Sequence, residues 1–371
     1  MEELKRKEGY RYFEIESIRK LGVELYTRYG LPREYAQLAL DVILTSDQMG
    51  IESHGVNRLT MYTDNFELGR VHMDAKPEIV YETPVSAVVE ANECMGQVAS
   101  VFGMRTAIEK AKKTGIAMVN VRNSNHFGIA GYYSLMACQE GMIGISMTNA
   151  EATVVPTFSR KPMMGTNPIA VSVPAEPHPW HMDFATSIIT NGKCEVYAKI
   201  GHTLPDGVLI DREGKPCKDP NTFLEIRRNK TLGGLAPLGG LGEGLSGHKG
   251  YGLSFLVDIL TAVMSGGFVS SQCRTVKSED RVCHFFAAID PAIWGDREEL
   301  RQRLTCELEK LRSAPLADGA DRIYVHGDKE VEAQKFALEN GIGMNEVTLR
   351  DIRLRCEKFG IQMENYLVEL A

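Results

Sequence analysis

The stretch Ile116-Ala117-Met118-Val119-Asn120-Val121-Arg122-Asn123-Ser124-Asn125-His126-Phe127-Gly128 decides the fold class of this chain. The apolar run at 116–121 predicts a strand, and the polar residues after it predict a loop. A helix is predicted next, at 130–140. Ligands usually bind at loops between a strand and a helix, so His126 is a candidate active-site residue. The alternative is a structural histidine in a loop that caps the helix.

Strands and helices are predicted on both sides of this stretch. Further strands are predicted at 87–90, 143–147, 169–173, 208–211 and 284–289, and further helices at 101–113 and 300–311. Helices are predicted at both chain ends, at 18–29, 35–49, 59–66, 329–339 and 346–359. A chain of 371 residues is longer than one core usually fills. We therefore predict an α/β domain at 77–329 and a helical domain formed by 1–76 and 330–371.

The composition is that of an ordinary globular protein. The formal net charge is -7 and no basic block stands out, which argues against a nucleic-acid or anionic-membrane surface. Residues 1–7 are charged, unlike the apolar core of a signal peptide. The most apolar long segment, 251–264, contains Asp258 and is too short to cross a bilayer. We expect a cytoplasmic protein with neither a nucleic-acid nor a membrane partner.

The cysteines and histidines show no metal-binding pattern. Eight cysteines are scattered without a C-x-x-C pair, which is typical of reduced, buried thiols in a cytosolic protein. A catalytic cysteine is the less favoured interpretation. His178 and His181 are three residues apart, but no cluster of carboxylates or cysteines accompanies them. We therefore predict no metal site.

A second stretch points to chemistry: Ser53-His54-Gly55-Val56-Asn57-Arg58, in the connector between the second and third predicted helices. Imidazole takes or gives a proton near neutral pH, and guanidinium holds a carboxylate through two parallel hydrogen bonds. His54 and Arg58 together are therefore typical of an enzyme that acts on a small hydroxy or keto acid. Taken singly, His54 has the alternative of a structural histidine, and Arg58 that of a surface ion pair.

Ser53 beside His54 also suggests a Ser-His-Asp hydrolase. Adjacent residues in a connector usually point apart, so we expect the Ser53 Oγ to miss the His54 ring. The chain also lacks the G-x-S-x-G motif of many serine hydrolases. The hydrolase interpretation is therefore the weaker one.

The segment 233–252 is rich in glycine and leads into an apolar helix. Glycine lets backbone N–H groups approach a phosphate, the start of a helix adds partial positive charge, and Lys249 beside His248 adds a full charge. Residues 242–247 match G-x-G-x-x-G, but the strand that should precede this motif and the acidic residue that should follow it in a doubly wound dinucleotide fold are both missing. The segment does not match the P-loop motif either. The alternative is a glycine linker that caps a core helix.

Two further polar positions have a local alternative. Thr166 lies in Gly165-Thr166-Asn167-Pro168, which a tight turn alone would explain. Asp183 follows a turn rich in proline and aromatic residues and precedes small residues that are typical of a helix start. Its alternative role is to cap that helix.

With these residues in place, the chain resembles the type-2 malate/L-lactate dehydrogenase family. The signatures occur in order from Ser53 to Lys329, so the resemblance covers most of the chain. They are 53–58, 125–128, 165–168, Asp183-Phe184-Ala185-Thr186, 247–252, 284–291 and Gly327-Asp328-Lys329.

The resemblance implies an α/β fold that is not the doubly wound dinucleotide fold. The expected architecture, similar to malate/L-sulfolactate dehydrogenases, has a largely antiparallel nicotinamide-binding sheet and a helical domain built from both chain ends. It also implies a smaller subdomain inserted in the NAD(P)-binding domain. Members are typically homodimers, with the helical domain as the dimerisation domain here.

The resemblance also implies residue roles. His54 corresponds by resemblance to the general acid/base of the family, supported by Ser53 and Asp183. His126 corresponds to a second active-site histidine near the nicotinamide and the substrate. Arg58 and Thr166 resemble ligands of the substrate carboxylate. The implied cofactor contacts are His126, Asp183, Phe184, Ala185, His248, Lys249, Gly327, Asp328 and Lys329. Relatives often carry glutamate after the glycine at 327, so the shorter Asp328 departs from the pattern.

The implied activity is oxidation of a small 2-hydroxy acid to its 2-keto acid, with malate favoured, NAD as the cofactor and NADP possible. Alternatives in the same class are a lactate, sulfolactate or ureidoglycolate dehydrogenase and a cyclic imine reductase. An alternative from another class is a non-catalytic nucleotide-binding homologue.

Overall fold

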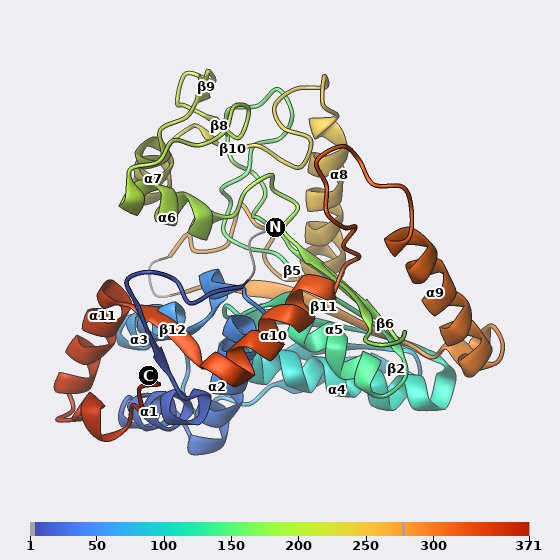
Figure 1. Cartoon of the computed structure of the whole chain (residues 1–371), viewed down its shortest axis with the longest axis horizontal. Coiled ribbons are helices and arrows are strands. Elements are labelled where there is room, and N and C mark those ends of the chain that lie inside the picture. The colour runs from blue at the N-terminus through green and yellow to red at the C-terminus, as the bar shows by residue number, and fades with distance from the viewer. Residues whose placement is uncertain (1–3, 277–278, 371) are drawn as a thin grey trace.

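The computed structural model of the chain describes residues 4–276 and 279–370, and a seven-stranded sheet lies at its centre (Figure 1). The strand order is β2-β3-β4-β11-β5-β6-β7. β3 and β4 are parallel, and the other neighbouring pairs are antiparallel. The bounds are β2 Glu78–Thr83, β3 Ser86–Glu90, β4 Ile116–Ser124, β5 Ile143–Thr148, β6 Ile169–Val173, β7 Trp180–Phe184 and β11 Val282–Ile289. The predicted α/β fold with a largely antiparallel sheet is confirmed.

Helices cover both faces of this sheet. α4 and α5 pack on one face, and α8 with the π-helical turn η3 packs on the other (Figure 1). Side chains alternate between the faces of a strand, so on the central strand Phe286 packs in the α4 and α5 core while Phe285 packs with Val257 of α8. The bounds are α4 Gly96–Thr114, α5 Ala130–Gln139, α8 Gly247–Asp258, η3 Ile259–Val263, η4 Pro291–Ile293 and α9 Arg297–Arg312.

Elements from the two chain ends lie side by side (Figure 1). β1 pairs antiparallel with β12, α2 packs against α10, and α3 packs against α11. Of these elements, β1, α2, α3, β12 and α11 contribute to one hydrophobic core that they share with the sheet. The bounds are β1 Tyr10–Phe13, α1 Ile15–Arg28, α2 Arg33–Gln48, α3 Leu59–Glu67, α10 Asp328–Asn340, β12 Ile342–Asn345, α11 Glu346–Glu357 and η5 Met363–Asn365. The division into domains at 76/77 and 329/330 stays a prediction.

A second, three-stranded sheet in the order β10-β8-β9 lies beside α6 and α7, apart from the main sheet (Figure 1). This part has its own core, which includes Phe223, Leu235 and Cys194. The bounds are α6 Asn191–Ile200, β8 Leu209–Ile210, β9 Pro216–Cys217, α7 Pro220–Asn229 and β10 Gly234–Leu235. This part of the chain matters for the site because its helices α6 and α7 line the same cavity as the connector between α2 and α3.

The structure confirms the strands and helices predicted for the middle of the chain and for both ends. The strand β7 was not predicted, and Asp183 lies within it, paired with Ala170 of β6. The alternative that Asp183 caps a helix is therefore wrong. β7 was missed because it follows a proline-rich turn and is short and mixed in polarity.

All eight cysteines are free thiols, and most of them are buried. In the described part of the chain, none of the helices combines the length and apolar character that crossing a bilayer requires.

The loop that carries His126 is fixed by the residue before it. The Asn125 side-chain amide donates to three backbone carbonyls, those of Arg70, Glu93 and Cys94, at 2.9–3.0 Å. Gly96, the first residue of α4, lies directly beneath the loop. A Cβ at position 96 would stand 2.2 Å from the Asn125 carbonyl oxygen and 2.3 Å from that of His126.

We therefore expect Gly96→Ala to lower the free energy of unfolding by about 2–3 kcal/mol, because the methyl group meets backbone that cannot rotate away. The matched control is Gly252→Ala in α8, where nothing lies within 4 Å of the added Cβ. That control should be neutral or stabilising, since alanine favours helix over glycine. Urea denaturation of both variants measures the difference, and equal effects would contradict the proposed contact.

Candidate active site

A cavity of about 300 Å³ lies where the connector between α2 and α3, the loop after β4, the ends of β6 and β7, and helices α6 and α7 meet. Most of the predicted site residues line it. They are Ser53, His54, Arg58, His126, Thr166, Asp183, Phe184 and Ala185.

The connector is held by a partly buried carboxyl group beneath it, that of Asp47. Asp47 Oδ2 accepts a hydrogen bond from the Val56 backbone N–H at 2.6 Å. A Cβ at Gly55 would stand 1.8 Å from Asp47 Oδ1, so only glycine lets the chain pass this close. Glu52 is tied to β1, where the Tyr10 hydroxyl donates to it at 2.7 Å. Two 3₁₀ turns result, η1 Glu52–His54 and η2 Val56–Arg58, and they carry the candidate catalytic residues.

Ser53 and His54 do meet, and the expectation that they point apart is wrong. The Ser53 Oγ lies 2.9 Å from the His54 Nδ1. Both residues lie in the tight turn η1, where the short serine side chain folds back onto the neighbouring ring. Within the described residues, no carboxylate hydrogen-bonds the opposite ring nitrogen, as a Ser-His-Asp triad would require. Ser53 therefore fixes the orientation of His54.

His126 is held by a hydrogen-bond chain that sequence patterns did not reveal. The Gln97 side-chain amide donates to the Tyr62 hydroxyl at 2.7 Å, and that hydroxyl lies 2.8 Å from the His126 Nδ1. The Gly128 backbone N–H also donates to Nδ1, at 3.4 Å. Burial raises the pKa of Tyr62, so its hydroxyl stays protonated and donates to the ring. Nδ1 is therefore an acceptor, and the ring carries its proton on Nε2.

The two histidine rings are stacked, with centroids 5.6 Å apart and planes inclined by 16°. Burial, together with nearby Arg58, lowers the pKa of His54 to about 3. Burial, followed by the charges of His54 and Arg58, lowers the pKa of His126 well below its usual value. Both rings are neutral at pH 7, and a neutral imidazole can accept a proton.

Asp183 faces the same cavity from β7. Its carboxylate accepts a hydrogen bond from the Gly131 backbone N–H at 2.7 Å, and burial raises its pKa to about 6. A Cβ at Gly131 would stand 2.9 Å from Asp183 Oδ2, so glycine is needed where α5 begins.

Arg58 is oriented by its own connector. Its Nε donates to the Ser53 carbonyl oxygen at 2.6 Å, whereas its Nη1 lies 3.7 Å from Glu195 Oε2 on α6. Gly192 leaves room for this side chain, because a Cβ there would stand 2.9 Å from Arg58 Nη2. Burial lowers the pKa of Arg58, the expected consequence of a cation that lacks a close counter-ion.

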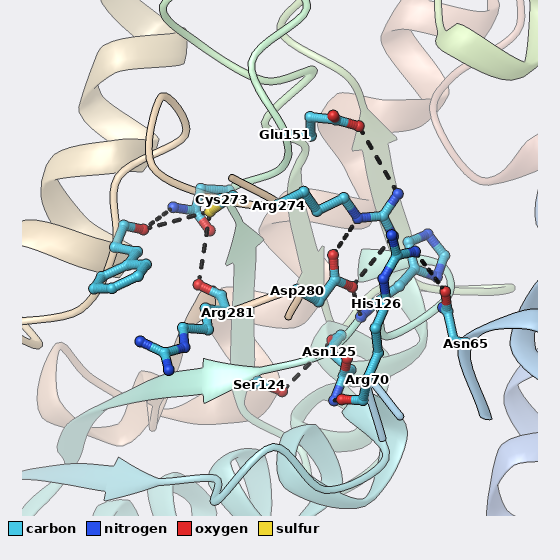
Figure 2. Close-up of polar contacts among 12 residues, drawn as sticks. Asn65, Arg70, Ser124, Asn125, His126, Glu151, Cys273, Arg274, Asp280 and Arg281 are labelled. Carbon is cyan, nitrogen blue, oxygen red and sulfur yellow. Dashed lines mark hydrogen bonds and ion pairs between the residues drawn. The ribbon is translucent and has the colours of Figure 1, made fainter. Parts of the chain in front are cut away.

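Charged residues that sequence patterns did not reveal also line the cavity: Glu151, Glu195, Arg227, Arg274 and Asp280. Figure 2 shows Arg274 between Glu151 and Asp280, with His126 beyond Asp280. Asp280 pairs with Arg274 and accepts a hydrogen bond from the His126 backbone N–H at 3.1 Å. None of these residues belongs to a recognised sequence motif, so the sequence did not mark them.

Several predicted cofactor contacts lie outside the cavity. His248 and Lys249 are exposed in the first turn of α8. Asp328 Oδ1 pairs with Arg312 at 2.7 Å and with His178 at 3.0 Å, and its Oδ2 accepts the Val325 N–H at 3.0 Å. Gly327 precedes α10 with φ +105°, and Lys329 lies 4.9 Å from the centre of the Tyr324 ring. The next residue of α10, Glu330, does line the cavity.

One buried acceptor in the cavity wall has no partner among the described residues. The Asn191 Oδ1 is buried without a hydrogen bond, and Asn191 lines the cavity at the start of α6. A ligand with an amide or hydroxyl donor would satisfy it. Across residues 4–276 and 279–370, no group of three or more His, Cys, Asp or Glu side chains is arranged to hold a metal ion.

The sequence profile of the family described as malate/L-lactate dehydrogenase matches residues 13–353. A malate dehydrogenase of Pyrococcus horikoshii is 40% identical over 341 residues, which are 92% of this chain and 93% of that protein. A malate/(S)-sulfolactate dehydrogenase of Methanothermus fervidus is 33% identical over 94% of this chain and 98% of its own. An NAD(+)-dependent ureidoglycolate dehydrogenase of Escherichia coli K12 is 29% identical over 84% of this chain and 86% of its own.

Solved structures agree with these sequence matches. Malate dehydrogenase from Entamoeba histolytica superposes with a TM-score of 0.92 at 35% identity, covering 95% of this chain and 99% of that one. Sulfolactate dehydrogenase from Methanocaldococcus jannaschii gives a TM-score of 0.85 at 30% identity, covering 96% and 99%. Because sequence and fold agree over nearly the whole length, this chain belongs to the malate/L-lactate dehydrogenase family of oxidoreductases.

Proposed function

We propose that this protein is a nicotinamide-dependent dehydrogenase that interconverts malate and oxaloacetate. The observation that carries the proposal is the cavity that unites a neutral histidine pair with Arg58. The 40% identity to a malate dehydrogenase supports malate over lactate, sulfolactate, ureidoglycolate and a cyclic imine. The presence of all the predicted catalytic side chains in one cavity argues against a non-catalytic homologue.

Arg58 is proposed to bind the C1 carboxylate of the substrate. Its Nε is occupied by the Ser53 carbonyl, and Glu195 approaches its Nη1 only to 3.7 Å. The terminal nitrogens are therefore available to a carboxylate, which would bind closer than Glu195 does. A fixed C1 carboxylate orients the C2–H bond, and this positioning contributes to the rate without new chemistry.

His54 is proposed to accept the proton of the C2 hydroxyl group during oxidation. Ser53 holds the ring through Nδ1, which leaves Nε2 for the substrate. Arg58 is one of the two causes of the low pKa of His54. A bound carboxylate neutralises Arg58, so the pKa of His54 should rise when substrate binds. His126, with its proton on Nε2, is proposed to donate a hydrogen bond to substrate or nicotinamide.

The cofactor is proposed to be NAD, with NADP as the alternative. Its nicotinamide ring would accept the hydride that leaves C2 of the substrate. The residues proposed to hold its nicotinamide end are His126, Asp183, Phe184 and Ala185, while Thr166 is proposed to bind the substrate carboxylate with Arg58. The unpaired Asn191 Oδ1 supports this assignment, because the carboxamide of nicotinamide carries the N–H donor that it lacks. The residues proposed for the rest of the dinucleotide are His248, Lys249, Gly327, Asp328 and Lys329. The relative named for NAD(+) supports NAD.

The protein is also proposed to be a homodimer. An exposed apolar patch on α8 and its continuation supports an interface between two copies; it consists of Leu253, Phe255, Leu256, Val263 and Met264. The resemblance instead assigned dimerisation to the helical domain, where Leu338 of α10 is 67% exposed.

Replacing Arg58 by glutamine should lower kcat/KM for malate. The corresponding activation free energy should rise by about 2–5 kcal/mol, the range for removing one partner of a buried charge pair. Following reduced nicotinamide by its absorbance, with NAD and with NADP, measures this loss and the cofactor preference together. Arg105→Gln on the exposed side of α4 is the control for loss of one positive charge. A near-wild-type kcat/KM for Arg58→Gln would remove Arg58 from the clamp.

The pH dependence should separate the two histidines. A base must be neutral to accept a proton, so oxidation should decline as the pH falls through the pKa that His54 has with substrate bound. His54→Gln should lower kcat about 100-fold or more and abolish this acid limb. His126→Gln keeps an N–H donor, so it should lose less activity and retain the limb. The assignment is reversed if His126→Gln is the variant whose profile becomes flat.

The two candidate dimer surfaces can be compared by analytical ultracentrifugation. We expect wild type and Leu338→Asp to sediment as dimers, and Phe255→Asp to sediment as a monomer, because a charge in the centre of an apolar interface is costly. Dissociation by Leu338→Asp alone would assign the interface to the helical domain. A monomeric wild type would contradict the homodimer.

A further inference from the structure

The cavity contains more positive charge than one carboxylate clamp requires. Besides Arg58, it is lined by Arg227 from α7 and by Arg274 from the segment before β11. Neither arginine has a role in the proton transfer or in the binding of the C1 carboxylate. Arginine is well suited to bind carboxylate-like anions, so the two side chains point to a second anionic group in the ligand.

These arginines have close counter-ions on one side of the guanidinium group, but the carboxylate on the other side, Glu151, is more distant. Arg227 Nη1 lies 3.0 Å from Glu195 Oε1, but its Nε lies 3.6 Å from Glu151 Oε2. The same Glu151 oxygen lies 3.9 Å from Arg274 Nη1. One carboxylate oxygen therefore faces two guanidinium groups without a close hydrogen bond to either. A ligand anion could bind both more closely than Glu151 does.

Arg274 is preorganised for such a ligand. Asp280 is buried and holds the Nε and Nη2 atoms of Arg274, with the Nη2 contact at 3.3 Å. The Nη1 atom is left on the side of Glu151, as Figure 2 shows. Asp280 also accepts the His126 backbone N–H at 3.1 Å. The same carboxylate thus fixes Arg274 and the loop that carries the second active-site histidine.

Acidic side chains of the same cavity balance the arginines unequally: Asp280 raises the pKa of Arg274, whereas the carboxylate nearest to Arg58 is Glu195, 3.7 Å away. The pKa of Arg58 is lowered by burial, and the positive charges of Arg227 and Arg274 lower it further against the opposing effect of Glu195. A ligand anion that approaches Arg227 and Arg274 more closely than Glu151 does would offset this repulsion between the guanidinium groups.

We propose that Arg227 and Arg274 form a subsite for the far-end anionic group of the substrate, so that the enzyme selects dianionic 2-hydroxy acids. This inference rests on the proposed function, because it takes Arg58 as the site of the C1 carboxylate. The subsite binds the C4 carboxylate of malate, and a sulfonate at the same position has the same charge. Acids with a methyl or an amide in this place lack the group that the subsite binds.

The first test compares malate with its 4-amide, which has nearly the same shape and no charge at the far end. Arg227→Gln should lower kcat/KM for malate roughly 100-fold and change that for the 4-amide by less than about 3-fold. The control is Arg228→Gln, the next residue of α7, which is exposed and does not line the cavity. It should keep the preference of wild type. An unchanged malate preference in Arg227→Gln overturns the subsite.

Arg274 needs a paired change, because Arg274→Gln alone leaves the Asp280 carboxylate buried without its partner. The double variant Arg274→Gln/Asp280→Asn keeps a hydrogen-bonded neutral pair. It should lower the preference for malate over the 4-amide at least 10-fold, whereas Asp280→Asn alone should retain the preference. A retained preference in the double variant removes Arg274 from the subsite.

Binding of succinate separates the subsite from the reaction. Succinate carries both carboxylates and no hydroxyl group, so its dissociation constant in the presence of NAD reports the two anion positions without turnover. Arg58→Gln and Arg227→Gln should each weaken succinate binding at least 10-fold, and only Arg58→Gln should weaken butyrate binding. If no 2-hydroxy acid is oxidised but succinate binding depends on Arg227, the proposed function fails and the subsite stands. If malate is oxidised and succinate binding ignores Arg227, the function stands and the subsite fails.

Discussion

The hydrogen bond between the Tyr62 hydroxyl and the His126 ring, 2.8 Å long, is the contact on which the arrangement of the site depends. Tyr62 belongs to α3, which follows the connector with His54, and His126 belongs to the loop after β4. The bond therefore joins the helical N-terminal part of the chain to the sheet at the point where both present a histidine. Because the Gln97 amide occupies the hydroxyl oxygen as a donor, the bond also fixes the ring tautomer.

Limited contact with water is the second constraint. His54, His126 and Asp183 are partly buried in the cavity wall, and desolvation is the first cause of each of their pKa shifts. Partial removal of such groups from water lowers the stability of the fold, and backbone donors offset this cost: Gly131 for Asp183 and Val56 for the partly buried Asp47. Glycines at 55, 96 and 131 provide the close approach that these contacts need. The three glycine positions thus accept no side chain without displacing part of the site.

Sequence patterns were sufficient to predict the elements with strong hydrophobic periodicity. They were also sufficient to find the motifs in which several polar residues stand together. The strands from β3 to β6, the central strand β11, the connector with His54 and the loop with His126 belong to this group. β1 and β12 escaped prediction because each is a short strand whose only partner lies at the other end of the chain. The contact of Ser53 with His54 depends on the side-chain conformations within one tight turn. Arg227 lies on α7, far in sequence from the Arg274 and Asp280 pair, so no local pattern could group the three.

The pairing of β1 with β12 has a consequence for synthesis of the chain on the ribosome. α2 and α3 flank the connector, and they pack against α10 and α11, which are among the last elements to emerge. During translation the sheet and the N-terminal helices can form part of their shared core while α2 and α3 still lack α10 and α11. Catalytic competence is therefore expected to appear late, when the C-terminal helices have closed over the N-terminal ones, and a nascent chain released before that point would be a partly folded protein without a working connector.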